Sequence, residues 1–212
     1  MTRTTNVAII GAGHMGAGLA QRLAAAGHTV TITARDATKA EQAAALAGTN
    51  ARAVRPEKIA AGADLVVLAV PYGAAVDALR AAGDLAGKTI VDMTNPLTAD
   101  MSGLVVGHTT SAAEEIQRAV PQVKLVKAFN TVFAQLFTAP AGPTKVQVLY
   151  AGDDAGAKDA VRALIEGAGF EPVDAGPLAN ARQLEPLGLL NIYLGYVAGR
   201  GTGVAPAWVA VA

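Results

Sequence analysis

Residues 7–18 read VAIIGAGHMGAG, an apolar run followed by the spacing Gly11-x-Gly13-x-x-Gly16. In a dinucleotide site the first glycine permits a tight turn, the second lets the backbone approach a pyrophosphate, and the third lets the helix pack closely on the strand. The apolar run predicts a strand before the glycines, and a helix and a second strand are expected after them. This context favours dinucleotide binding over the alternative, in which the glycines serve packing alone.

The turn also contains Ala12, His14 and Met15, which we count among the candidate cofactor contacts. We expect the backbone N–H groups of His14 and Met15 to face the phosphates, because the first N–H groups of a helix have no partner within it. The ring of His14 either lies near the pyrophosphate or points to solvent, and we expect solvent. The three histidines of the chain show no metal-ligand spacing, so no metal site is expected.

The stretch TITARDATK, residues 31–39, lies where an NAD site normally has an acidic residue at the end of the second strand. Here the strand end is Thr33-Ala34-Arg35, and Lys39 follows one helical turn later. An acid would repel the 2′-phosphate of NADP, whereas an arginine binds a phosphate with two hydrogen bonds and a lysine adds a positive charge. The sequence therefore predicts NADP(H), not NAD(H). The alternative is that both cations are ordinary solvated residues at a helix start.

Strand and helix patterns alternate along the chain. Strands are expected at 6–10, 30–33, 51–54, 64–70, 89–92 and 123–129, and helices at 14–26, 37–47, 72–81 and 111–119. This alternation predicts the α/β class with a doubly wound parallel sheet. After a Pro/Gly-rich loop at 137–144, strands are expected at 146–151 and 171–174, and helices after Asp153 and at 178–198. We expect a dinucleotide-binding domain at 1–125 and a smaller C-terminal α/β domain at 126–212, which packs against the sheet or continues it.

Three segments follow strands of the expected sheet and should lie at its carboxyl edge, where ligands of open α/β sheets bind. Their backbone carbonyls are expected to hold a nicotinamide carboxamide, and their apolar side chains to wall its ring. No Ser-His-Asp set, lysine motif or paired carboxylate is evident, so no catalytic residue is assigned. This fits hydride transfer between two organic cofactors, where the protein mainly positions the rings. The candidate contacts are Val70, Pro71, Tyr72, Thr94, Asn95, Pro96, Ala128 and Asn130.

The chain has 212 residues, of which 52% are hydrophobic, and Lys+Arg and Asp+Glu both number 17. Without a basic patch, a nucleic-acid or membrane-surface partner is not expected. The absence of cysteine excludes a disulfide scaffold, a thiol nucleophile and a cysteine-ligated metal. No apolar segment fits a signal peptide or approaches the about 18–20 residues of a membrane span. We therefore expect a cytoplasmic protein that binds small molecules.

Five stretches resemble one known family. They are GAGHMGAGLAQRLAAAGHTVTITARDATKAE (11–41), LAVP (68–71), VKAFNT (126–131), AGDD (151–154) and DAGPLANARQLEPLGLLNI (174–192). The chain resembles the NADPH:F420 oxidoreductases, also called F420H2:NADP oxidoreductases. It is also similar to the oxidoreductase domain of the STEAP metalloreductases, which pass hydride from NADPH to a flavin. VKAFNT resembles that second branch more closely.

The resemblance implies a Rossmann-like domain, a smaller C-terminal part, and a cleft between them for a second cofactor. In the family, residues matching Thr33, Arg35 and Lys39 hold the 2′-phosphate, and those matching Pro71 and the 94–96 loop lie near the nicotinamide. The family has a histidine in the segment matching Asn130, where this chain departs from it. The tail 199–208 would cover the acceptor site.

The expected activity is hydride exchange between NADP(H) and the deazaflavin coenzyme F420. The alternatives are an NADPH-dependent reductase of a flavin or of a small imine or carbonyl compound, and a non-enzymatic NADP(H) sensor. A carbonyl acceptor would need an acid, for which Tyr72 is the candidate. The apolar helix at 178–198 is either a homodimer face or part of the core.

Overall fold

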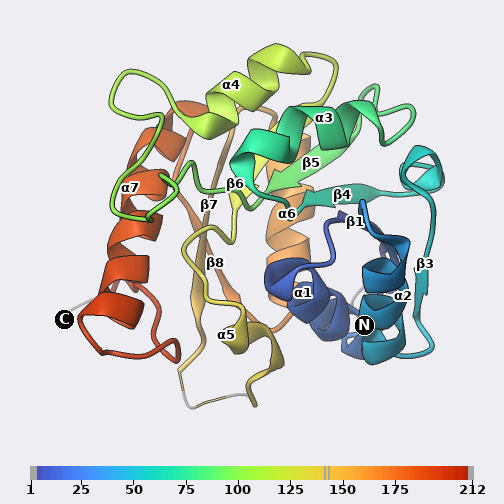
Figure 1. Cartoon of the computed structure of the whole chain (residues 1–212), viewed down its shortest axis with the longest axis horizontal. Coiled ribbons are helices and arrows are strands. Elements are labelled where there is room, and N and C mark those ends of the chain that lie inside the picture. Colours follow the sequence, from blue (N-terminus) through green and yellow to red (C-terminus); the bar gives the residue numbers. More distant parts are fainter. Residues whose placement is uncertain (1–3, 141, 143, 210–212) are drawn as a thin grey trace.

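The residues that the structure describes (4–140, 142 and 144–209) include eight strands, which form one sheet in the order β3-β2-β1-β4-β5-β6-β7-β8 (Figure 1). In this computed structural model the strands are β1 (Asn6–Ile10), β2 (Thr29–Thr33), β3 (Ala51–Ala53), β4 (Leu65–Leu68), β5 (Thr89–Asp92), β6 (Lys124–Ala128), β7 (Gln147–Gly152) and β8 (Glu171–Asp174). The α-helices are α1 (His14–Ala25), α2 (Ala37–Ala47), α3 (Ala75–Arg80), α4 (Ala112–Ala119), α5 (Gln135–Thr138), α6 (Ala155–Gly167) and α7 (Ala181–Ile192). Shorter helical segments are η1 (Pro56–Lys58), η2 (Tyr72–Ala74), η3 (Leu178–Asn180) and the π-helix η4 (Tyr193–Val197).

The first six strands are parallel, and β1 lies between β2 and β4. The chain therefore builds outward from β1 in one direction and then in the other, which is the Rossmann-like doubly wound arrangement. The predicted fold class is confirmed. The strands that follow β1 are added first on one side of it (β2, β3) and then on the other (β4, β5, β6). A crevice for a ligand is expected at this change of side, where the carboxyl ends of β1 and β4 lie next to each other.

One strand pairing in the C-terminal part is antiparallel. β7 runs antiparallel to β6, with Ala128 opposite Tyr150, and β8 runs parallel to β7. A parallel neighbour needs a long crossover, usually a helix that returns the chain to the starting edge of the sheet. The segment between β6 and β7 contains only α5, a helix of four residues, so β7 starts at the edge where β6 ended.

Apolar side chains fill both faces of the sheet. On one face the core joins β1, β4 and β6 to α1, α2, α5 and α6. On the other face it joins the same sheet to α3, α4 and the start of α7, and α3 and α4 lie together above the strands in Figure 1. The strands β4 and β5 are almost fully buried, as the near-continuous apolar runs of central parallel strands predict.

The C-terminal part continues this sheet, since β7 and β8 extend the edge that β6 begins. The domain boundary expected after residue 125 lies inside β6. The two parts form one continuous sheet, and the division into domains at 1–125 and 126–212 stays a prediction. No helix within the described ranges is long and apolar enough to cross a membrane.

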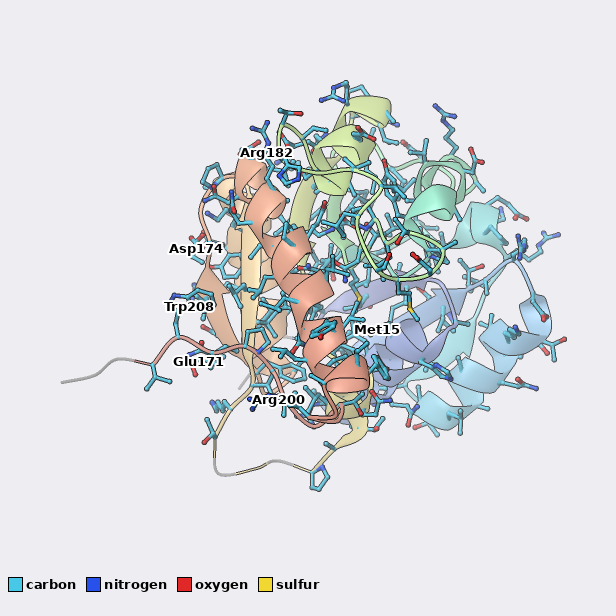
Figure 2. All side chains as sticks on the ribbon, turned by 60° about the vertical axis from the view of Figure 1, so that its left-hand side comes forward. Met15, Glu171, Asp174, Arg182, Arg200 and Trp208 are labelled. Carbon is cyan, nitrogen blue, oxygen red and sulfur yellow. The ribbon has the colours of Figure 1, made fainter. Side chains whose placement is uncertain are left out.

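The expected helix at 178–198 is observed as η3, α7 and η4 in succession. The tail then turns back along α7 toward the start of β7, where the Trp208 N–H donates to Gln147 Oε1 at 2.7 Å. Figure 2 shows this course: Met15, in the first turn of α1, and Trp208 lie on opposite sides of α7. The tail thus follows the far side of α7 from the glycine-rich turn, and its expected role as a cover of the acceptor site stays a prediction.

Candidate functional site

The glycine-rich turn lies at the carboxyl end of β1, and two of its glycines are required by close backbone contacts. Gly11 has φ +117°, and its N–H donates to the Thr33 carbonyl at 2.8 Å. A Cβ at Gly11 would lie 2.2 Å from the Ala69 carbonyl oxygen, and a Cβ at Gly16 would lie 1.9 Å from the Gly11 carbonyl oxygen. Any side chain at either position would therefore push α1 and β4 away from β1.

The middle glycine has a different environment. A Cβ at Gly13 would meet no atom within 4 Å, and both Gly13 and His14 are exposed. Gly13 is the N-cap of α1, and the first turn of this helix contains no acidic residue. The free N–H groups and the positive end of the helix dipole thus face open space, which fits an anionic group such as a pyrophosphate.

Two cations lie beyond the end of β2. Arg35 and Lys39 are exposed, and neither forms an ion pair with another described residue. The neighbouring acid, Asp36, caps α2 by accepting a hydrogen bond from the Thr38 N–H at 3.0 Å. Thr33, at the end of β2, is buried and its Oγ1 lacks a partner. This stretch therefore has two cations without ion pairs and a hydroxyl without a hydrogen-bond partner among the described residues, and the 2′-phosphate role stays a prediction.

Tyr72 does not fit the role of a proton donor to a substrate. Its hydroxyl donates a hydrogen bond to Glu115 Oε2 on α4. Burial, followed by this bond and the charge of Glu115, raises the pKa of Tyr72 well above its ordinary value. The phenol is therefore protonated at physiological pH, but its proton is committed to Glu115.

The loops after β5 and β6 are joined by their asparagines. Asn95 Nδ2 donates to the Asn130 carbonyl at 2.8 Å, and Asn130 Nδ2 donates to Asn95 Oδ1 at 3.0 Å. Asn130 Nδ2 also donates to the carbonyl of Leu184 on α7 at 2.8 Å. A Cβ at Gly188 would lie 2.7 Å from Asn95 Oδ1, so α7 packs directly on this pair.

Unpaired polar atoms are concentrated at this edge of the sheet. Within the described part of the chain, six buried side-chain oxygen or nitrogen atoms have no hydrogen-bond partner. Four of them end or follow the strands β2, β5 and β6: Thr33 Oγ1, Thr94 Oγ1, Asn130 Oδ1 and Thr131 Oγ1. Buried polar atoms normally have partners, so these four mark positions along the edge where a polar ligand would supply them. The sequence predicts the first three of these residues as cofactor contacts but not Thr131.

A buried ion network at the same edge was also missed from the sequence. Lys127 on β6 has no solvent exposure, and its Nζ lies 2.9 Å from Asp92 Oδ2 and 3.0 Å from Glu185 Oε1. The available signal was a lysine inside an otherwise buried strand and an aspartate at the end of its neighbour. Because Glu185 comes from α7, no local pattern identifies the third member.

Two apolar grooves lie along α7, on the side that faces the tail. One, of about 270 Å³, is formed by α7 and the tail, and the other, of about 380 Å³, also includes β7 and Trp208. Leu187 lines both grooves, whereas Glu185 and Gly188 contact the strand-end loops from the opposite side of α7. Asn191, which lines the first groove, donates to the Thr131 carbonyl at 3.1 Å, and Leu184, which lines the second, accepts from Asn130 Nδ2, so both grooves adjoin residues that contact the loop after β6.

Comparisons with family models, with curated proteins and with solved structures all match this chain to F420-dependent NADP reductases. Residues 6–96 match the family described as NADP oxidoreductase, coenzyme F420-dependent. This segment runs from β1 through the loop after β5, and it includes the glycine-rich turn and Arg35. The F420-dependent NADP reductase of Methanothermobacter thermautotrophicus is 34% identical in an alignment of 205 positions, and the match covers 89% of this chain and 88% of that protein.

Two further relatives extend this result. The metalloreductase STEAP3 of Rattus norvegicus is 32% identical over 186 residues, and this chain spans only 37% of the rat protein's length. A crystal structure from Arthrobacter sp. FB24, described as a candidate F420-dependent NADP reductase, has a TM-score of 0.81 and 34% identity, covering 93% of this chain and 96% of that one. This chain is therefore similar to these relatives in sequence, and to the Arthrobacter protein in fold over nearly its whole length.

Proposed function

This chain belongs to the family of F420-dependent NADP reductases and is an NADP-dependent oxidoreductase, and we propose that its reaction is hydride exchange between NADP(H) and coenzyme F420. The observation that carries the proposal is the match to F420-dependent NADP reductases along nearly their whole length. The unpaired polar atoms at the carboxyl edge of the sheet support a cofactor site in the same place.

In the proposed complex, the phosphate groups in the adenosine half of NADP(H) bind to positively charged side chains and to the N-terminus of α1. The 2′-phosphate contacts Arg35, Lys39 and the hydroxyl of Thr33, beside Ala34. The pyrophosphate lies over Gly13 and accepts hydrogen bonds from the start of α1, in the turn that runs from Gly11 through Ala12, His14 and Met15 to Gly16. The open space at Gly13 and the unpaired cations fit these roles.

The nicotinamide half is proposed to lie over the loops that follow β4, β5 and β6. Thr94 Oγ1 and Asn130 Oδ1 are buried and unpartnered, so they can take the polar atoms of a carboxamide. The remaining proposed contacts of the ring are Val70, Pro71, Tyr72, Asn95, Pro96 and Ala128.

The two cofactors supply the chemistry: a hydride from NADPH and a proton from solvent together convert F420 to its reduced form. The protein then has to bind the two rings, orient them and exclude water from them, and it does not have to provide a nucleophile. No side chain is assigned as a catalytic acid, because the proton of Tyr72 is bonded to Glu115.

A flavin is the second candidate acceptor. The similarity to metalloreductase STEAP3 favours it. Asn130 also supports it, since the resemblance to the deazaflavin reductases implies a histidine in that segment. An imine or carbonyl acceptor is less well supported, since the Tyr72 proton is not free for it.

The test is NADPH oxidation by the purified protein under argon, with F420, FMN, FAD or no acceptor in parallel. Turnover with F420 and not with the flavins supports the proposal, whereas turnover only with a flavin replaces it with the second candidate. The variant Arg35→Ala/Lys39→Ala is the matched control, because a contaminating reductase would be unaffected by it. If NADPH binds and F420 is not reduced, the proposed reaction is wrong.

We also propose that the protein is a homodimer that pairs through α7 and η4. Leu190, Tyr193, Tyr196 and Val197 are 51–69% exposed on successive turns, next to an apolar groove. A second copy offers both a matching groove and matching side chains. Light scattering should give twice the chain mass of 21.3 kDa. Tyr193→Lys/Val197→Lys should then give monomers, whereas Leu46→Lys, at an exposed leucine of α2, should not.

A further inference from the structure

The buried ammonium of Lys127 has no proton left for a ligand. Its three N–H groups point to three acceptors: Asp92 Oδ2, Glu185 Oε1 and the backbone carbonyl of Thr94. Neither Lys127 nor Asp92 is exposed, and Glu185 is 1% exposed. An ammonium has three donors, so this one is fully used within the protein.

Every oxygen of the two carboxylates accepts a hydrogen bond as well. Asp92 Oδ1 accepts from the Thr94 N–H at 2.9 Å. Glu185 Oε2 accepts from the Ala112 N–H at 2.9 Å, and Glu185 Oε1 accepts from the Ala113 N–H at 3.1 Å, so Glu185 caps the start of α4. The network therefore joins β5, β6, α4 and α7 through charge-assisted hydrogen bonds.

Thr94 is the residue that this network holds from both sides. Asp92 binds its N–H, and Lys127 binds its carbonyl oxygen. The side-chain hydroxyl of Thr94 is left buried and without a partner. The backbone of Thr94 is thus fixed by two buried charges, while its side chain remains available to a ligand.

Stability alone does not explain such a network. Burying three charged groups costs desolvation, and well-packed apolar replacements are often neutral or stabilising. What charges supply, and apolar side chains do not, is a defined direction for each hydrogen bond. The left-handed backbone of Phe129, at φ +64°, shows that the neighbouring loop is also held in an uncommon conformation.

We propose that Lys127 is a positioning residue, which acts with Asp92 and Glu185 to set the backbone of Thr94 and thereby the orientation of the nicotinamide. The inference rests on the proposed function, in which the 94–96 loop receives that ring. Lys127 touches neither cofactor, since all its donors are used. Its effect is on the alignment of the ring for hydride transfer rather than on cofactor affinity, which the phosphate contacts at Gly13 and Arg35 dominate.

The main test is the double variant Asp92→Asn/Lys127→Met. It removes the donor to the Thr94 carbonyl and keeps the cluster at one net negative charge, that of Glu185. The expected result is full NADPH stoichiometry with a dissociation constant within about 3-fold of the parent, and a kcat lower by about 10- to 100-fold, as for a misaligned reactant. The fluorescence lifetime of bound NADPH should also differ from that of the parent, because this lifetime depends on the surroundings of the nicotinamide.

Asp92→Asn alone is the second variant, in case the double variant does not fold. Lys127 and the Thr94 N–H bond to different oxygens of Asp92, and an asparagine replaces one of these oxygens by an NH2 group that cannot accept, so one of the two bonds is lost in this geometry. A loss of kcat and a changed lifetime are expected, with NADPH affinity again preserved. Gln117→Met is the control: it removes hydrogen bonds that Gln117 makes to the backbone of Val123 and Leu125, and it should lower stability without altering the lifetime.

A folded variant that binds NADPH with the parent's lifetime and kcat would overturn the inference. Equal losses of binding stoichiometry and kcat would also overturn it, since they indicate a structural role. The lifetime needs no acceptor, so it remains decisive if the parent fails to reduce F420. In that case the proposed reaction is wrong, and the positioning role is judged on the lifetime alone.

Discussion

Asn95 and Asn130 bind each other through two hydrogen bonds across the carboxyl ends of β5 and β6. Asn95 Nδ2 donates to the Asn130 carbonyl, and Asn130 Nδ2 returns a bond to Asn95 Oδ1. Asn130 Nδ2 also reaches the carbonyl of Leu184, which brings α7 into the same unit. Two loops that are 35 residues apart in the sequence therefore act as one surface.

The first prediction concerns this unit. Asn130→Leu should lower the free energy of unfolding by about 1–3 kcal/mol, because the buried Leu184 carbonyl and the half-buried Asn95 Oδ1 lose their donor. Urea denaturation measures the change. Asn180→Leu is the control: Asn180 is exposed, and water can replace its bond to the Ala175 carbonyl. Equal losses for the two variants would contradict the buried role of Asn130.

The glycines of the turn should separate folding from binding. Gly16→Ala places a Cβ 1.9 Å from the Gly11 carbonyl oxygen, so it should cost about 1–3 kcal/mol of stability by overpacking. Gly13→Ala meets no atom and has φ −75°, so its stability should stay within about 0.5 kcal/mol of the parent. Its NADPH affinity should nevertheless fall, because the methyl group takes the space of the pyrophosphate. Unchanged NADPH binding by Gly13→Ala, measured by titration calorimetry, would place the phosphates elsewhere.

Arg35→Ala should weaken NADPH binding by about 10- to 100-fold, since a hydrogen bond to a charged group is worth about 1.5–3 kcal/mol. NADH affinity should not change, because NADH lacks the 2′-phosphate. Fluorescence titration with both cofactors measures the two constants. Arg52→Ala, which removes another exposed cation on β3, should leave both constants as they are. An equal loss of NADH affinity would contradict a contact with the 2′-phosphate and would mean that Arg35 supports the structure of the site.

The ion pair of Glu114 and Arg182 should make stability depend on pH. Hydrogen bonds from Arg182 Nε and Nη2 hold the pKa of Glu114 below its usual value of 4.5. A lowered folded-state pKa contributes stability that is present above pH 4.5 and is lost as the pH falls through the lowered pKa. Arg182→Met should therefore be less stable than the parent at pH 7, with a difference that shrinks on acidification.

Urea unfolding of both proteins between pH 7 and pH 3 tests this. The matched control is Arg80→Met, which removes an exposed pair of 3.8 Å with Asp77 and should show almost no effect. A difference between Arg182→Met and the parent that is constant over the whole range would mean that Arg182 acts by packing and not through the charge of Glu114.

Local pattern was sufficient for the first half of the fold. The apolar runs and the glycine spacing predicted β1 to β6, the parallel sheet and the turn at Gly11, Gly13 and Gly16, because periodicity and glycine geometry depend only on neighbouring residues. The last residue of β2 is Thr33 and not an acid, which is likewise a feature of a short stretch, so the prediction for Arg35 and Lys39 needs the sequence alone.

Tertiary structure decided the rest. The antiparallel β7, the path of the tail along α7, and the pairs Asn95–Asn130, Asp92–Lys127 and Tyr72–Glu115 all join segments that are distant along the chain. A hydrogen bond across 35 or 43 residues has no local periodicity, since its partners meet only when the strands have been ordered and the helices packed. The sequence by itself thus determined the kind of fold and the glycine-rich turn, whereas only the packed structure decided which buried side chains hold the loops at the carboxyl edge of the sheet.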